Sequence, residues 1–279
     1  MSVQRIDARF AALKAENRAA FVAYMMAGDP DTATALEILK GLPAAGADLI
    51  ELGVPFSDPM AEGPPIQRAA LRALTAGMTL SGTLDMARRF RESDQTTPII
   101  LMGYLNPLMN RGFERFARDA AAAGVDGLIA VDCPPEEERP LADALDAEGI
   151  ALVRFATPTT DDARLKLIAR RTSGFIYYIS VAGVTGVKDA DAAAVAPAVE
   201  RVRRATGLPT AVGFGIKTPE TAAAVARVAD AVVVGSVLVD EIAAAVAEGQ
   251  PVARKVLETA ARLAQAVRTA RVGQPAVQA

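Results

Sequence analysis

Short apolar runs alternate along this chain with longer stretches in which apolar residues recur every three or four positions. Short apolar runs bounded by turn residues are typical of buried strands, and the longer period is typical of amphipathic helices. The predicted strands span residues 21–27, 48–52, 99–102, 127–131, 151–155, 174–180, 210–213 and 231–235. The predicted helices span residues 5–16, 33–41, 66–76, 80–91, 113–123, 135–148, 163–171, 192–206, 219–228, 237–246 and 252–269.

This alternation of strands and helices predicts a parallel α/β sheet with right-handed crossovers. Eight such strands would close a (β/α)8 TIM barrel, and the helix at 5–16 is an extra N-terminal helix that could plug the barrel bottom. A barrel needs roughly 250 residues, so residues 1–279 are expected to form a single TIM-barrel domain. The alternative is an open doubly wound sheet, which would have a glycine-rich turn after the first strand. The turn here is Ala27-Gly28-Asp29-Pro30, which favours the barrel.

Composition narrows the possible chemistry. With 30 basic and 33 acidic residues, the chain has no excess charge that would predict a nucleic-acid surface. No apolar run reaches the ~18 residues that a membrane span needs, no signal-peptide core is present, and the only cysteine is Cys133, so a cytoplasmic location is expected. The absence of histidine removes the commonest general base and metal ligand. Acid–base chemistry must therefore fall to Asp, Glu, Tyr, Lys or Cys133. Because no histidine can activate its thiol, Cys133 is expected to be a small buried residue rather than a nucleophile.

The most informative segment follows the second predicted strand. Glu51 lies near the end of that apolar run, where burying a carboxylate needs a reason. The loop that follows, residues 54–64, carries Asp58, Glu62 and three prolines and is called the acidic loop below. It is expected to act as a lid over the strand end, with Glu51 as the candidate general acid/base. Asp58 and Glu62 could alternatively be solvated loop charges.

The later strand ends are rich in glycine. Gly186, Gly213, Gly215 and Gly235 come after the predicted sixth, seventh and eighth strands, and Gly235-Ser236 opens a predicted helix. Backbone N–H groups at such a helix N-terminus bind phosphate, and barrels of this kind often place a phosphate there.

Aromatic and aliphatic side chains lie on the strands or at their ends. They could line a flat apolar pocket or could belong to the barrel core. Asp132, before Pro134 and Pro135, is expected to cap the helix predicted at 135–148. The candidates for the pocket are Tyr24, Tyr104, Ile129, Val131, Tyr177 and Phe214.

Together these segments resemble the tryptophan synthase alpha subunit family over residues 5–268. The resemblance rests on Glu51-Leu-Gly-Val-Pro-Phe-Ser-Asp-Pro59, Gly103-Tyr-Leu-Asn-Pro107, Gly183-Val-Thr-Gly186, Gly213-Phe-Gly-Ile216 and Gly235-Ser236, in the family's order and spacing. The first of these motifs is highly specific, and the short glycine motifs are not specific alone.

The resemblance implies a lyase of tryptophan biosynthesis. Such a lyase would cleave indole-3-glycerol phosphate by a retro-aldol reaction to indole and glyceraldehyde 3-phosphate. Glu51 would be the general acid/base, and Glu62 would bind the indole N–H. Thr185 would hydrogen-bond that second acid. Gly186, Gly213, Gly235 and Ser236 would hold the phosphate, and Tyr24, Ile129, Val131, Tyr177 and Phe214 would enclose the indole ring with Tyr104 beside them.

The resemblance also implies a partner. Members of the family form an αββα heterotetramer and pass indole to a beta subunit that carries pyridoxal phosphate, while the alpha subunit uses no metal or cofactor. Asp58 and residues 105–108 would face that partner.

One position departs from the family pattern, because the second acid is commonly aspartate and is Glu62 here. The longer side chain leaves open a catalytically weak subunit kept to activate its partner. A different phosphate-binding aldolase or isomerase is the other alternative, although the strand ends lack the lysine or histidine that such enzymes commonly use.

Overall fold

The strands of the protein form one parallel sheet that curls into a barrel. The structure, a computed structural model, describes residues 3–179, 192–213 and 215–273. Within these residues the sheet has nine strands, in the order β5-β4-β3-β2-β1-β9-β8-β7-β6. The strands are β1 (Ala20–Met26), β2 (Leu49–Gly53), β3 (Ile99–Gly103), β4 (Gly127–Ala130), β5 (Ala151–Leu152), β6 (Arg154–Ala156), β7 (Ile176–Ile179), β8 (Thr210–Gly213) and β9 (Ala231–Val234).

The fifth predicted strand is divided in two. β5 pairs with β4 and β6 pairs with β7, and only Val153 separates β5 from β6. The pairing therefore continues around the ring through one short extended segment. The predicted (β/α)8 TIM barrel is confirmed, with its fifth strand bent where it passes from one neighbour to the other.

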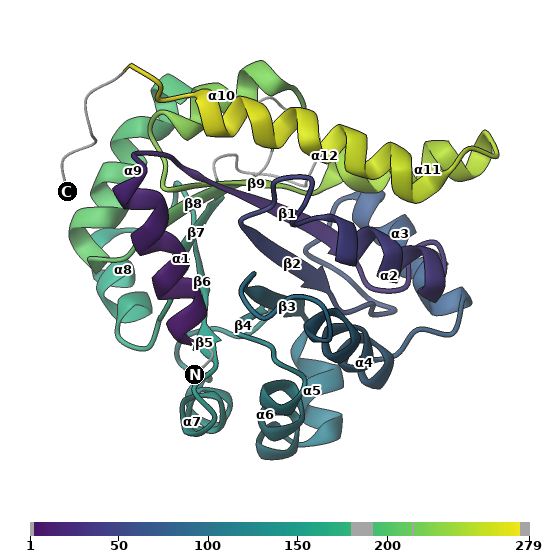
Figure 1. The fold of residues 1–279 in the computed structure, drawn as a ribbon. Coiled ribbons are helices and arrows are strands. Elements are labelled where there is room, and N and C mark those ends of the chain that lie inside the picture. Colours follow the sequence, from purple (N-terminus) through teal and green to yellow (C-terminus); the bar gives the residue numbers. More distant parts are fainter. Residues whose placement is uncertain (1–2, 180–191, 214, 274–279) are drawn as a thin grey trace.

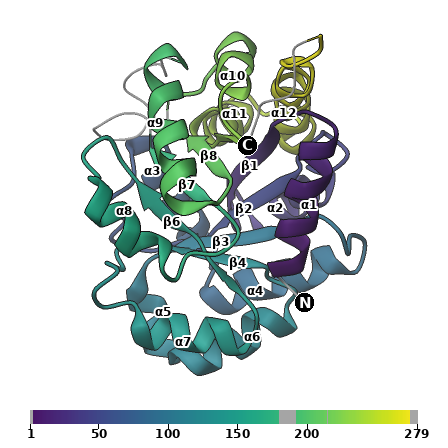
Figure 2. The ribbon, with the colours of Figure 1, turned by 90° about the vertical axis from the view of Figure 1, so that its left-hand side faces the viewer.

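The helices lie outside the sheet, with α10 to α12 along one side and α4 to α7 along the opposite side (Figures 1 and 2). They are α1 (Val3–Ala15), α2 (Thr32–Gly41), α3 (Pro64–Thr75), α4 (Leu80–Arg91), α5 (Leu105–Arg111), α6 (Phe113–Ala122), α7 (Arg139–Ala147), α8 (Asp162–Ala169), α9 (Ala192–Thr206), α10 (Pro219–Ala226), α11 (Ser236–Ala247) and α12 (Val252–Thr269).

Two segments differ from the predicted helices. The segment 105–111 forms α5, where the sequence predicts no helix. The helix predicted from residue 135 begins at Arg139, because Pro140 suits the first turn of a helix and the preceding prolines lie in a turn. Asp132 does not cap that helix, since its Oδ1 instead accepts a hydrogen bond from the Leu105 N–H at 2.8 Å.

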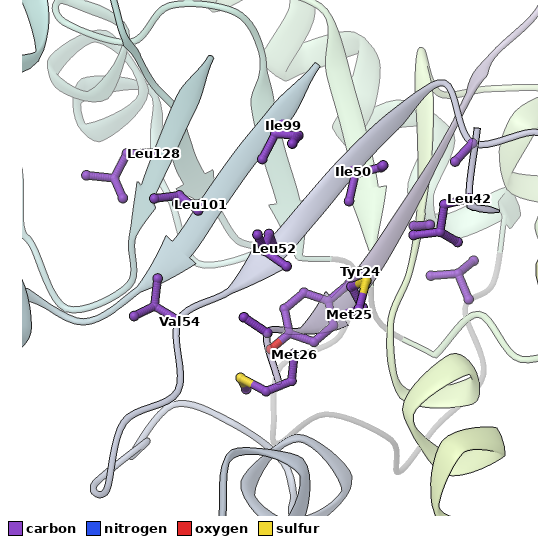
Figure 3. Close-up of a cluster of buried hydrophobic side chains, with 14 of the residues drawn as sticks. Tyr24, Met25, Met26, Leu42, Ile50, Leu52, Val54, Ile99, Leu101 and Leu128 are labelled. Carbon is purple, nitrogen blue, oxygen red and sulfur yellow. The ribbon is translucent and has the colours of Figure 1, made fainter. Parts of the chain in front are cut away.

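Alternation along the strands gives the core two layers. In β2, Ile50 and Leu52 point outward to the helices, and Figure 3 shows them beside Ile99 and Leu101 of β3. Leu49 points into the barrel and packs with the interior cluster. Because side chains alternate between the two faces of a strand, Glu51 shares the interior face with Leu49.

Helix α1 closes the bottom of the barrel, as predicted. Its apolar side chains Ile6, Phe10 and Leu13 pack with the interior cluster, and the Phe10 and Phe175 ring centroids lie 5.8 Å apart. Arg5 donates to the buried Asp126 at 2.7 Å. The N-terminal helix is therefore tied to strands that come much later in the chain.

Candidate functional site

Glu51 lies at the carboxyl end of β2, inside the barrel. The parallel register places it beside Tyr24 of β1 on one side and Ile100 of β3 on the other. Only 1 % of the residue is exposed. Its Oε1 atom is buried and has no hydrogen-bond partner among the described residues. An unpartnered buried carboxyl oxygen costs free energy, so this position is not explained by fold stability.

The acidic loop brings a second carboxyl group to the same place. The outer part of this loop is exposed, including Asp58 and Met60. Glu62 then turns inward and is 6 % exposed, directly before α3 begins. Ile66, one turn into α3, lines the same cavity as Glu62.

Burial raises the pKa of both acids. The pKa of Glu51 rises to about 8, mainly because burial disfavours the charged form and then because Glu62 is nearby. Burial raises the pKa of Glu62 to about 7. The two groups therefore titrate near neutral pH as an interacting pair. Such a pair can hold a proton on one member while the other is ionised, which suits acid–base chemistry.

A cavity joins the two carboxyl groups to the later strand ends. It measures about 50 Å³ and is lined by Tyr24, Glu51, Glu62, Ile66, Met102, Tyr177, Gly215, Ile216, Val233, Gly235 and Ser236. Ligand sites usually hold ~300 Å³ or more, so the walls must move outward to admit a drug-sized molecule. Tyr24 and Tyr177 are both buried, and burial next to the two carboxyl groups raises the pKa of each hydroxyl.

One end of this cavity suits an anion. Helix α11 begins at Ser236, and Gly235 at its N-cap supplies no capping side chain. The first N–H groups of a helix have no intrahelical acceptor and carry the positive end of its dipole. Gly215 has φ +76°, a conformation that favours glycine and brings bare backbone to the cavity. Together these features form a backbone cradle for a phosphate-sized group.

A larger cavity, about 570 Å³, lies at the opposite end of the barrel, where α1 meets the residues after α9. Its partly buried arginines Arg18 and Arg203 form ion pairs. Arg18 binds Asp48 at 2.8 Å and Arg203 binds Asp230 at 3.0 Å. Because these pairs fix the bottom of the barrel, this end is assigned to stability, and the reactive groups lie at the other end.

Comparison with known proteins gives the family of the chain. The family model described as "Tryptophan synthase alpha chain" matches residues 10–268. A tryptophan synthase alpha chain of Caulobacter vibrioides (strain NA1000 / CB15N) is 73% identical over 273 residues, which cover 98% of this chain and 99% of that protein. The alpha chain of Phenylobacterium zucineum is 72% identical over 99% of this chain and 100% of its own.

The chain belongs to the tryptophan synthase alpha chain family. It is thus a lyase component of tryptophan biosynthesis, and an alpha chain implies a beta subunit as its partner. Solved structures agree. Tryptophan synthase subunit alpha from Legionella pneumophila str. Paris superposes with a TM-score of 0.89 at 39% identity, over 94% of this chain and 98% of that one. A Mycobacterium tuberculosis tryptophan synthase chain gives 0.86 at 34% identity, over 95% and 98%.

The structure of this alpha chain brings together seven of the residues that the sequence nominated. They line the cavity described above: Tyr24, Glu51, Glu62, Tyr177, Gly215, Gly235 and Ser236. Thr185, Gly186 and Phe214 lie outside the described residues.

Four nominated residues lie beside the cavity walls rather than in them. Ile129 belongs to the barrel interior and Val131 packs against it. Gly213 ends β8, where an added Cβ would collide with the ring and hydroxyl of Tyr177. The Tyr104 hydroxyl contacts the acidic loop and accepts a hydrogen bond from the Ala61 N–H at 3.0 Å.

Four wall residues, Ile66, Met102, Ile216 and Val233, are not among the predicted site residues. Met102 lies two positions after Ile100, and Val233 two positions after Ala231, on interior faces of their strands. Strict alternation would have found both. Ile66 could have been found only from its place one helical turn after Glu62.

Other predictions concern metals and membranes. Among the described residues, no cluster of three or more His, Cys, Asp or Glu side chains could hold a metal ion. No helix in the described part of the chain is long and apolar enough to span a bilayer. Cys133 is buried, as expected, and burial raises the pKa of its thiol.

Proposed function

We propose that Glu51 and Glu62 carry out the retro-aldol cleavage of indole-3-glycerol phosphate to indole and glyceraldehyde 3-phosphate in this alpha chain. The observation that carries the assignment is the buried Glu51 oxygen, which has no hydrogen-bond partner among the described residues and lies in the same cavity as Glu62. The pKa of about 8 keeps Glu51 protonated at neutral pH and ready to act as an acid.

In the proposed reaction, Glu51 gives its proton to the indole ring carbon that bears the glycerol chain. The resulting carboxylate assists removal of the proton from the adjacent hydroxyl. The carbon–carbon bond to the ring then breaks, its electron pair restores the indole ring, and the hydroxyl carbon becomes the aldehyde. Glu62, as a carboxylate, accepts a hydrogen bond from the indole N–H and stabilises the positive charge that ring protonation creates.

The remaining walls would bind the substrate. Tyr24 and Tyr177 would enclose the indole ring, with Ile129 and Val131 behind them and Phe214 as a further contact. Gly235 and Ser236 would hold the phosphate at the start of α11 together with Gly213 and Gly186, and Thr185 would bond Glu62. Because the cavity is small, binding would move its walls outward.

The partner would bind near the acidic loop. Asp58 is exposed there, and the two segments nominated as partner-facing carry or adjoin large exposed apolar side chains, Met60 (83 %) and Met109 (61 %). The rings of Phe56 and Tyr104 stack with centroids 5.4 Å apart, which joins the two segments into one surface. We assign this surface to a beta subunit that carries pyridoxal phosphate, in an α2β2 heterotetramer. Absence of a cofactor in this chain and a cytoplasmic location stay predictions.

Indole release by the purified chain, with and without a beta subunit, tests the assignment. Glu51→Gln should fold normally and lose turnover by about a thousandfold or more, because glutamine can neither give a proton to the ring carbon nor take one from the hydroxyl. The control Glu37→Gln changes an exposed carboxylate on α2 and should leave turnover unaltered. Turnover of Glu51→Gln within tenfold of the parent would contradict the acid/base role.

Partner dependence separates the remaining alternative. A slow reaction that rises sharply with the beta subunit supports a catalytic subunit. No indole release in either condition, with an intact fold, would indicate a subunit kept only to activate its partner.

The pH profile of kcat/KM gives an independent check. It should rise as Glu62 ionises near pH 7 and fall as Glu51 loses its proton near pH 8. A profile that is flat from pH 6 to 9 would contradict the paired assignment.

A further inference from the structure

Side chains from two other segments hold the backbone on both sides of Glu62. The Tyr104 hydroxyl accepts a hydrogen bond from the Ala61 N–H at 3.0 Å. The Gln67 side-chain amide donates to the Glu62 carbonyl oxygen at 2.8 Å. The N–H of Glu62 donates to the Pro59 carbonyl at 3.0 Å. These three bonds fix the peptide groups from which the Glu62 side chain projects.

Tyr104 is itself held from outside the acidic loop. It directly follows β3, is buried, and occupies the N-cap position of α5. Its ring stacks on Phe56 at an interplanar angle of 30°. The next residue, Leu105, donates its N–H to Asp132 after β4. The hydroxyl that holds the loop is therefore positioned by two strands of the barrel.

These hydrogen bonds matter because side-chain exposure changes abruptly between Ala61 and Glu62. Met60 and Ala61 are exposed, whereas Glu62 is buried beside Glu51. A small rotation of the 61–62 peptide would turn the carboxylate toward solvent. A displacement of order 1 Å can cost ~100-fold in rate.

We propose that Tyr104 and Gln67 are positioning residues that hold the Glu62 carboxylate in the cavity and act on turnover through it. The inference rests on the proposed catalytic role of Glu62. It reassigns Tyr104 from a substrate contact to a support of the acidic loop. It also gives the segment after β3, which is assigned to the partner surface, a direct connection to Glu62, so that a shift of α5 on partner binding moves the acid.

Tyr104→Phe tests the inference with little disturbance, because it keeps the ring and its stacking on Phe56 and removes only the acceptor. We expect kcat to fall by about 10- to 100-fold and KM to change by less than about threefold. The rising limb of the pH profile should move to lower pH, because a Glu62 carboxyl that is less buried has a lower pKa. Gln67→Met removes the side-chain donor to the Glu62 carbonyl oxygen. It should likewise lower kcat and move the rising limb of the pH profile to lower pH.

Tyr178→Phe is the matched control. It removes a tyrosine hydroxyl from a buried position on β7 that belongs to the outer core layer and does not line the cavity. Neither kcat nor the pH profile should change. An equal loss in this control would show that the effect is a general cost of deleting a buried hydroxyl and would overturn the inference.

A double-mutant cycle separates this inference from the function on which it rests. With Glu62→Gln as the background, Tyr104→Phe should change kcat by less than about twofold, since the group it positions has lost its charge. An undiminished loss in that background would overturn the positioning role and leave Glu62 catalytic. Full activity of Glu62→Gln alone would overturn both the role of Glu62 and the inference.

Discussion

Replacing Glu51 by glutamine should make the folded chain more stable at pH 8 than the parent. In the parent, the folded-state pKa of Glu51 is about 8 and the ordinary value is 4.5. Between these values the unfolded carboxyl has lost its proton and the folded one retains it. The unfolded state then binds fewer protons, so the stability of the parent falls as the pH rises from about 4.5 to about 8. Glutamine does not titrate, so the stability of the Glu51→Gln variant does not fall with pH for this reason.

The size of the effect follows from the shift. Each pKa unit corresponds to about 1.4 kcal/mol, so the parent should lose about 3 kcal/mol relative to Glu51→Gln between pH 5 and pH 8. The Oε1 atom, which has no partner among the described residues, does not change this difference, because its surroundings do not depend on pH through a bonded group there. Loss of the nearby Glu62 repulsion acts in the same direction.

Urea unfolding of the parent, Glu51→Gln and Glu37→Gln at pH 5, 6, 7 and 8 would measure the effect. The free-energy difference between Glu51→Gln and the parent should grow steadily with pH, whereas Glu37→Gln should follow the parent. Parallel curves within about 0.5 kcal/mol across this range would refute the reasoning, because Glu51 would then ionise in the folded chain as it does in the unfolded one. A gain in stability together with lost activity would show that Glu51 lowers the free energy of unfolding and is needed for turnover.

Three further outcomes are expected. Asp29→Asn should cost about 2 kcal/mol in urea unfolding, because it breaks the buried two-bond pair with Arg72 at 2.7 and 2.8 Å and leaves that guanidinium without its carboxylate. Gly213→Ala should raise KM and lower kcat, because the new methyl group must displace the Tyr177 ring. Unchanged steady-state kinetics would show that turnover does not depend on the present position of that ring. Glu62→Asp should retain measurable indole release, and complete loss with an intact circular dichroism spectrum would show that the acidic loop is built around the longer side chain.

Local signals in the sequence were sufficient for the barrel and for the acid pair. Glu51 interrupts an apolar strand, and the loop after it carries the second acid, so both positions could be read without knowing the rest of the fold. Gly235-Ser236 was equally readable, because a glycine between a strand and a helix is a local pattern. The resemblance to the family then named the reaction.

The contacts that the sequence did not predict have a common physical cause, which is that they are long-range. Asp132 has the sequence context of a helix cap but binds Leu105, which is 27 residues away. Tyr104 has the position of a pocket residue, and its hydroxyl bonds the backbone 43 residues earlier. Val153 separates β5 from β6 because that segment changes pairing partner, which no local pattern encodes.

The anchoring of α1 determines the order in which the barrel can be completed during synthesis. This helix is made before the strands of the barrel, but Arg5 binds Asp126 and Phe10 packs on Phe175. Its apolar face therefore has no finished surface to cover until about two thirds of the chain has emerged. Until then Ile6, Phe10 and Leu13 would be open to chaperones or to a neighbouring nascent chain. A helix that is made before the strands it covers is thus among the later elements to reach its final place.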